Sequence, residues 1–302
     1  MITINDVEIK TVGDGMTWEG AKDTVSRTLN FTVLYVPEDV NFPKYQLKCG
    51  DKVQWIENNI TKFVGYIQTL DYSTTGESIN VNCIDLMVRL LKSKCIGRFK
   101  GTLQELTNNI CNLFGLQNGI ESDNKHVHNI VSTGDLSYYD ILKTACDTMF
   151  ERYTLYLDGT TLKLNDHEVV QTFTIGQNIR SSSFRQDLSE LVTKVLIINE
   201  QGKVLNSVQN DEDLKNLGLF QEVYTYSKDC KNNLAEATKM LKSVANEANI
   251  SVNDDLNCIS GAFIKVIEPI NNFIGIFEIQ TDNHTIGADS VLDMEIKYVS
   301  AG

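Results

Sequence analysis

Residues 272–286 read NFIGIFEIQTDNHTI, and a similar pattern occurs near the start of the chain, where Phe63–Thr69 reads FVGYIQT. An alternating apolar run that ends in polar residues is typical of a strand leading into a turn. The Asp282–His284 triplet would also suit a metal site or an acid/base pair. A comparison of the two copies decides between these interpretations.

The elements around the two stretches follow one another in the same order. The matching elements, first copy before second, are Gly50 and Gly261, Val53–Glu57 and Ile264–Glu268, and Ile79–Cys83 and Leu292–Ile296. The spacing from the first glycine to the glycine of the next strand is 15 residues in one copy and 14 in the other. Strand sequences are alike in composition, so chance is the alternative, but order and spacing together favour an internal duplication.

In this alignment Asp282–His284 falls beside Asp71 and Tyr72, where the first copy has no histidine. The triplet then belongs to a polar loop between strands, residues 72–76 in the first copy and 283–287 in the second. Asp and Asn followed by Gly suit the backbone of such a connection. We therefore predict a loop, with no catalytic or metal-binding role for Asp282 and His284.

The other histidines and the cysteines form no recognisable reaction centre. His126 and His128 supply only two ligands, and His167 lies at a predicted domain boundary. The seven cysteines include no C-x-x-C pair, which favours reduced core thiols. Motifs of nucleotide-binding loops, serine hydrolases and zinc proteases are missing. The prediction is no enzyme, with no catalytic, cofactor-binding or metal residues; a cell-wall hydrolase that uses His284 is an alternative.

The charge of the chain excludes a free nucleic-acid binder. The formal net charge is −13 and the sequence pI is about 4.8, so DNA should be repelled. The basic run, which we predict to be a solvated face or a contact with an acidic protein, comprises Arg89, Lys92, Lys94, Arg98 and Lys100. Neither an apolar run long enough to span a bilayer nor a signal peptide is present, which predicts synthesis in a cytoplasm without membrane insertion.

The pattern along the chain predicts a mainly β fold with α+β elements. Two similar small antiparallel β-barrel domains, residues 1–97 and 167–302, should flank a helix-containing middle domain, residues 98–166. A capping box begins a predicted helix at Thr102, Ser137–Asp140 signals a second helix, and a hairpin with an Asp158-Gly159 turn follows. An amphipathic stripe over residues 234–249 predicts one further helix, inserted in the second barrel domain.

With these features the chain resembles the baseplate hub proteins of contractile phage tails and phage-tail-like bacteriocins. The similarity is to the hubs of PBSX-type prophages, which are related to the late control D family and the T-even hub. The residues that carry it are Met16–Trp18, Gly50–Val53, Phe63–Gly65, Leu90–Lys94, Phe99, Thr102–Gly115, Gly261 and Gly275–Thr285.

The resemblance implies a virion or bacteriocin component, a homotrimer that joins the sixfold tail tube to the threefold spike. Three chains with two barrels each would close a ring of six similar positions. Expected partners are the tube and spike proteins, with the tape-measure protein and baseplate wedge or adaptor proteins as further candidates. Because the chain ends at Gly302 after its last predicted strand, the spike should be a separate polypeptide. A carbohydrate- or receptor-binding β module, with Trp18, Trp55 and the tyrosines as stacking platforms, is the alternative from another class.

Overall fold

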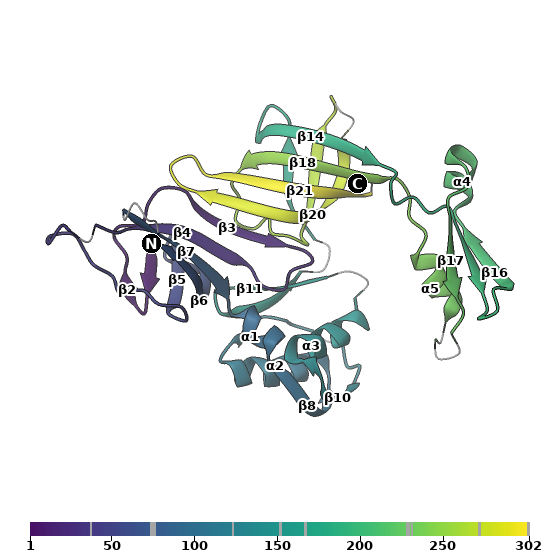
Figure 1. The fold of residues 1–302 in the computed structure, drawn as a ribbon, viewed down its shortest axis with the longest axis horizontal. Helices are drawn as coiled ribbons and strands as arrows, with labels where there is room; N and C mark the ends of the chain where they lie inside the picture. The colour runs from purple at the N-terminus through teal and green to yellow at the C-terminus, as the bar shows by residue number, and fades with distance from the viewer. Residues whose placement is uncertain are drawn as a thin grey trace. The chain divides into compact units, whose positions relative to one another are not determined.

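The duplication predicted from the sequence is present as two antiparallel sets of five strands with the same order of pairing (Figure 1). In the first set β3, β4, β7, β6 and β5 are successive neighbours, and in the second β14, β18, β21, β20 and β19. The first set comprises β3 (Met16–Ala21), β4 (Thr28–Leu34), β5 (Lys52–Glu57), β6 (Ile60–Tyr72) and β7 (Ser78–Asp85). The second comprises β14 (Ile179–Asp187), β18 (Ala245–Asn253), β19 (Phe263–Glu268), β20 (Phe273–Ile286) and β21 (Val291–Ser300).

This computed structural model describes residues 1–36, 38–72, 77–122, 124–150, 153–165, 168–227, 230, 232–270 and 273–300. The chain divides into two units, Met1–Ser181 with Ile250–Gly302, and Ser182–Asn249. The fold is mainly β with helices, as predicted. Over the described ranges the sheets are open, so the expected small barrels are two halves of one 13-stranded sheet.

Backbone hydrogen bonds fix which residues of the two sets correspond. The amide of Gly50 donates to the carbonyl of Ile67 (2.8 Å), and the Ile67 amide donates back to the residue after Gly50 (2.9 Å). Gly261 and Ile279 repeat this pair at 2.7 and 3.0 Å. Both glycines have positive φ, +90° and +85°, which explains why the motif needs glycine.

The correspondence confirms the predicted alignment of two strands and corrects the third. Cys83 pairs with Ile67 as Ile296 pairs with Ile279, so the last strands align as predicted. Between β6 and β20, however, the predicted alignment pairs Gly65 with Gly275, whereas the hydrogen bonds make Gly65 correspond to Phe277, two residues further along. The shift is even, so the same side chains face the core and the sequence pattern could not reveal it.

The region after the first set contains α1 (Met87–Lys92), α2 (Leu103–Phe114) and α3 (Tyr138–Asp147) (Figure 1) and packs around an apolar core that also includes Val64 of β6. Its strands are β8 (Lys94–Gly101), β9 (Gln117–Asn118), β10 (His128–Ser137), β11 (Thr154–Asp158) and β12 (Thr161–Asn165). The predicted capping box at Thr102 is present, and the second predicted helix also begins with one, at Ser137. The hairpin is also present, but its central turn residues are Gly159 and Thr160, because Asp158 already pairs with Thr161.

The segment between β14 and β18, which correspond to β3 and β4 of the first set, makes up most of the second unit, residues 182–249. The elements of this unit are β15 (Lys194–Ile198), β16 (Val204–Gln209), α4 (Asp211–Leu217), β17 (Gln221–Thr225) and α5 (Asn233–Lys239). The predicted helix over 234–249 is wrong beyond Lys239, since Ala245–Asn253 forms β18. Buried Ala248, Ile250 and Val252 recur every second residue, the period of a strand, and this outweighed the helical stripe.

Three short strands flank the two sets. They are β1 (Ile2–Ile4), β2 (Val7–Glu8) and β13 (Val169–Thr174). β1 runs antiparallel to β5, whereas β13 runs parallel to β19. The duplicated sets therefore differ at their outer strands. No helix in the described ranges has the length and apolarity that crossing a bilayer would need.

Candidate assembly site: the seam between the two strand sets

The two strand sets are joined by β20, the longest strand. Its first half pairs with β19, and its second half, Thr281–Ile286, pairs antiparallel with Ala21–Met16 of β3. Figure 1 shows β20 and β3 side by side although they lie at opposite ends of the chain. We call this β20–β3 junction the seam.

The seam contains the Asp282–His284 triplet, and the predicted loop is wrong at this point. Asp282 pairs with Met294 of β21 on one side and with Gly20 of β3 on the other, so the triplet is strand in the interior of the sheet. The strand continues to Ile286, and the turn follows it. The matching loop residues 73–76 of the first copy lie outside the described residues.

A buried ion pair crosses the seam. Arg27, 6% exposed, donates from both terminal nitrogens to the two carboxylate oxygens of Asp282, which is 2% exposed. The Nη1–Oδ1 distance is 2.9 Å, and the amide of Ser260 donates to the same Oδ1 at 2.6 Å. Two-point pairing of this kind fixes orientation as well as distance, so it sets how the two sets meet.

His284 extends the pair into a cluster of four charges. Its Nδ1 donates to Asp254 Oδ1 at 2.6 Å, and its Nε2 lies 3.3 Å from Asp282 Oδ2. With His284 protonated, two cations face two carboxylates and the cluster of Arg27, Asp254, Asp282 and His284 is neutral. We call these four residues the seam cluster.

Packing around the seam cluster is tight. The guanidinium of Arg27 lies 4.0 Å from the ring centroid of Trp18, and the His284 ring lies 5.0 Å from it. A Cβ at Gly20 would be 2.4 Å from Arg27 Nη1, so β3 needs a glycine opposite Asp282. The indole thus covers the charges on one side and excludes water from them.

Burial and the polar partners shift the pKa values of Asp282, His284 and Asp85 in opposite directions. Burial alone would raise the pKa of Asp282, but the charge of Arg27 and hydrogen bonds from His284 and Arg27 lower the pKa to about 2. Burial would lower the pKa of His284, yet its hydrogen bonds to Asp254 and Asp282 raise it above the usual value. For Asp85, burial dominates the amide hydrogen bonds from Arg27 and Met87, and its pKa rises to about 7.

The other histidines are not gathered into a site. The rings of His126 and His128 are 4.8 Å apart, and His128 Nδ1 lies 3.2 Å from Thr148 Oγ1. Burial and the neighbouring His126 lower the pKa of His128. His167 lies outside the described residues. Within the described ranges, no group of three or more His, Cys, Asp or Glu side chains is arranged so that it could hold a metal ion.

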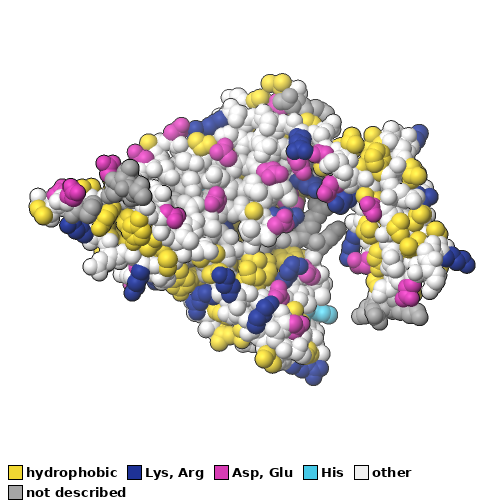
Figure 2. All heavy atoms as spheres, in the orientation of Figure 1, with side chains coloured by type: hydrophobic (Ala, Val, Ile, Leu, Met, Phe, Trp, Pro, Cys, Tyr) yellow, Lys and Arg dark blue, Asp and Glu magenta, His cyan; other side chains and the backbone are white. Residues whose placement is uncertain are grey.

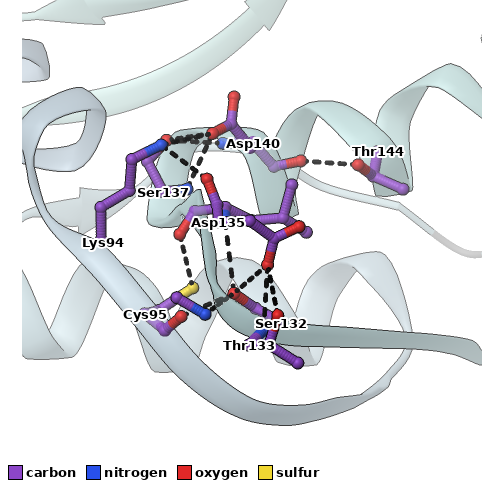
Figure 3. Close-up of polar contacts among 10 residues, drawn as sticks. Lys94, Cys95, Ser132, Thr133, Asp135, Ser137, Asp140 and Thr144 are labelled. Atoms are coloured by element: carbon purple, nitrogen blue, oxygen red, sulfur yellow. Dashed lines mark hydrogen bonds and ion pairs between the residues drawn. The ribbon is translucent and has the colours of Figure 1, made fainter.

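The predicted basic run lies on α1 and β8 and is partly anchored within the chain. Arg89 donates to Phe114 O (3.1 Å) and Arg98 to Asn129 Oδ1 (2.6 Å). Lys94 donates to Asp135 O and approaches the Ser137–Asp140 capping box (Figure 3). Basic and acidic side chains are both scattered over the visible surface (Figure 2). A contact of this run with an acidic protein stays a prediction.

The tryptophans named as glycan platforms are core residues. Trp18 is 5% exposed and Trp55 is 1% exposed, and their rings meet edge to face at 5.7 Å. Neither ring face is open to a sugar.

The sequence drew attention to Asp282 and His284 but favoured a loop for them, and it gave no indication of their partners Arg27 and Asp254. Arg27 is 255 residues from Asp282 in the chain. Only the pairing of β20 with β3 brings them together, and no local pattern encodes that pairing. Arginine just before an apolar strand was the one available signal.

Comparisons with solved structures confirm the resemblance seen in the sequence at the level of the fold. The 43 kDa tail protein of prophage MuSo2 from Shewanella oneidensis matches with a TM-score of 0.73 and 13% identity, covering 98% of this chain and 96% of that one. A tail protein from Neisseria meningitidis MC58 has a TM-score of 0.69 at 11% identity, with 98% and 95% covered. Prophage tail protein gp18 from Listeria monocytogenes EGD-e has a TM-score of 0.60 at 13% identity, and the match covers 97% of this chain and 91% of that one.

No curated protein matches the chain in sequence. A family model described as YQBQ-like matches residues 16–297, which is nearly the whole chain. The chain therefore belongs to the YQBQ-like family, with the fold of prophage tail proteins.

Proposed function

We propose that the chain is the structural hub of a contractile tail or related injection particle, a homotrimer that joins the sixfold tube to the threefold spike. The observation that carries the proposal is the duplicated strand set within one chain, held by the seam. Three such chains would present six similar positions to a tube above and three chemically identical ones to a spike below. The role is mechanical, without catalysis.

The charge and surface of the chain support this role. A net charge of −13 around a tube would keep DNA or an unfolded polypeptide from adhering during passage. The unit of residues 182–249 exposes several large apolar side chains (Figure 2). They include Leu188, Val204, Leu205, Leu219 and Val223. Neighbouring tail proteins, such as wedge or adaptor subunits, would cover them.

Light scattering coupled to size exclusion tests the proposal. The chain, mixed with the tube and spike proteins of its own particle, should elute with three copies per complex. A single copy in the presence of both proteins would contradict the hub role.

A further inference from the structure

The end of β6 corresponds to the part of β20 that forms the seam. Thr69 and Thr281 each follow the bulge in their strand and occupy equal positions. Two and three residues further along each strand, Asp71 and Tyr72 of β6 correspond to Asn283 and His284 of β20. The two strand ends therefore have the same backbone setting with respect to their own sets.

These equivalent ends differ in what covers them. Tyr72 is 60% exposed, whereas His284 is fully buried. β20 has a strand on each side at this level, β21 and β3. Over the described residues, β6 beyond Ile67 pairs with β7 alone. The first set thus has an open edge where the second set has its seam.

The strand that would complete this edge also exists in the chain. β14 corresponds to β3, since it is the neighbour of β18 as β3 is the neighbour of β4. β3 lies between two strands, whereas β14 ends the sheet order and, in the described part, pairs with β18 and makes one bridge at Ile179. Arg180 and Ser181 of β14 are exposed.

We propose that Gln68–Tyr72 of β6 pairs antiparallel with Ile179–Ser181 of β14 from a second copy of this chain, in the way that β20 pairs with β3. The proposal rests on the trimeric hub and names the surfaces that close it. An unpaired strand edge is a template for another chain. Because the two edges differ, the contact is head to tail, and repeated by rotation it closes a ring.

The side chains at the open edge of β6 are compatible with a contact that forms between copies only after each chain has folded. At the positions of Asp282 and His284 the first set has Leu70 and Tyr72, so the free chain leaves no unpaired buried charge there. On β14, Arg180 is already held within its own chain, since it pairs with Asp289 (2.8 Å) and donates to Asn253 Oδ1 (2.9 Å), so the proposed contact does not depend on its charge. This joint can open without the penalty that separating the seam cluster would carry.

Cross-linking between differently tagged copies tests the pairing. One copy carries Asp71→Cys and the other Ser181→Cys, both with Cys49→Ser and Cys230→Ser, in the presence of the tube and spike proteins. A short bismaleimide should join position 71 to 181, and neither 71 to 71 nor 181 to 181. Thr69→Cys, on the same face of β6, covers a shifted register, and Asp6→Cys on the β1–β2 turn is the unreactive control.

The outcomes separate this pairing from the hub role. A chain with both Asp71→Cys and Ser181→Cys should give products of up to three copies and no more. Three copies by mass without a link from position 69 or 71 to 181 would overturn the pairing and leave the trimer standing. Links that continue beyond three copies would support the pairing and overturn ring closure. A single copy by mass with no link would overturn both.

Discussion

The two strand sets share their order of pairing, yet the same strand end is sealed in one and open in the other. In the second set the end of β20 meets β3 through the seam cluster. In the first set the end of β6 is exposed and carries Leu70, Asp71 and Tyr72. The contrast teaches that one fold element can be used twice, once as a permanent internal joint and once as an edge available to another copy.

Removing the guanidinium of Arg27 should lower the stability of the chain most. Arg27→Ala leaves Asp282 buried without its main partner, and we expect the free energy of unfolding to fall by about 3–5 kcal/mol. Urea denaturation followed by circular dichroism measures it. The matched control is Lys22→Ala, whose pair with Glu278 is partly exposed and should be worth about 1 kcal/mol or less. Equal losses in both variants would refute a special role for the seam.

Acid should weaken the sealed joint. The pKa of Asp282 is about 2 in the folded chain and 3.8 in the unfolded one. A lowered folded pKa contributes stability above the unfolded value, so about 2 kcal/mol should be lost as pH falls from about 4 to about 2. Melting temperatures across this range, compared with Asp282→Asn, would show the difference. A variant with the same acid slope as the parent would rule Asp282 out as its source.

Adding a side-chain carbon at Gly20 should lower the stability of the chain by a smaller amount than Arg27→Ala. Gly20→Ala places a Cβ 2.4 Å from Arg27 Nη1, and displacing the guanidinium should cost about 1–3 kcal/mol. Gly13→Ala is the control, because its Cβ would meet only ordinary contacts at 3.5 Å or more. Thermal unfolding that leaves Gly20→Ala as stable as Gly13→Ala would mean that the packing described for Arg27 is wrong.

Asp85 should change the pH dependence of stability in the opposite direction to Asp282. Its folded pKa, raised to about 7 by burial, means that stability is lost as pH rises from about 4 to about 7. Asp85→Asn cannot ionise, so its stability should depend less on pH in this window, with a net gain at pH 8. The side-chain carbonyl of the variant can still accept one of the two amide hydrogen bonds. Asp51→Asn, at a second buried acid, controls for the loss of charge alone. An unchanged pH slope in Asp85→Asn would contradict the assignment.

The sequence predicted the local elements and the duplication, but not the joints between them. Capping residues at Thr102 and Ser137 mark helix starts because the signal and the structure involve the same few residues. The helix over 234–249 failed because a short apolar stretch fits both periods, and pairing with distant strands decided for β18. The polar Asp282–His284 triplet favours a loop in the sequence, because nothing next to it in the chain accounts for charged side chains in a buried strand. Their partners Arg27 and Asp254 come from elsewhere in the chain.

The central claim is that each chain supplies two similar positions to a sixfold ring. Electron cryo-microscopy of the tail end of the assembled particle tests it most directly. The account predicts three copies of this chain, with six related strand sets around the axis. Six copies, or strand sets that do not repeat around the axis, would contradict it.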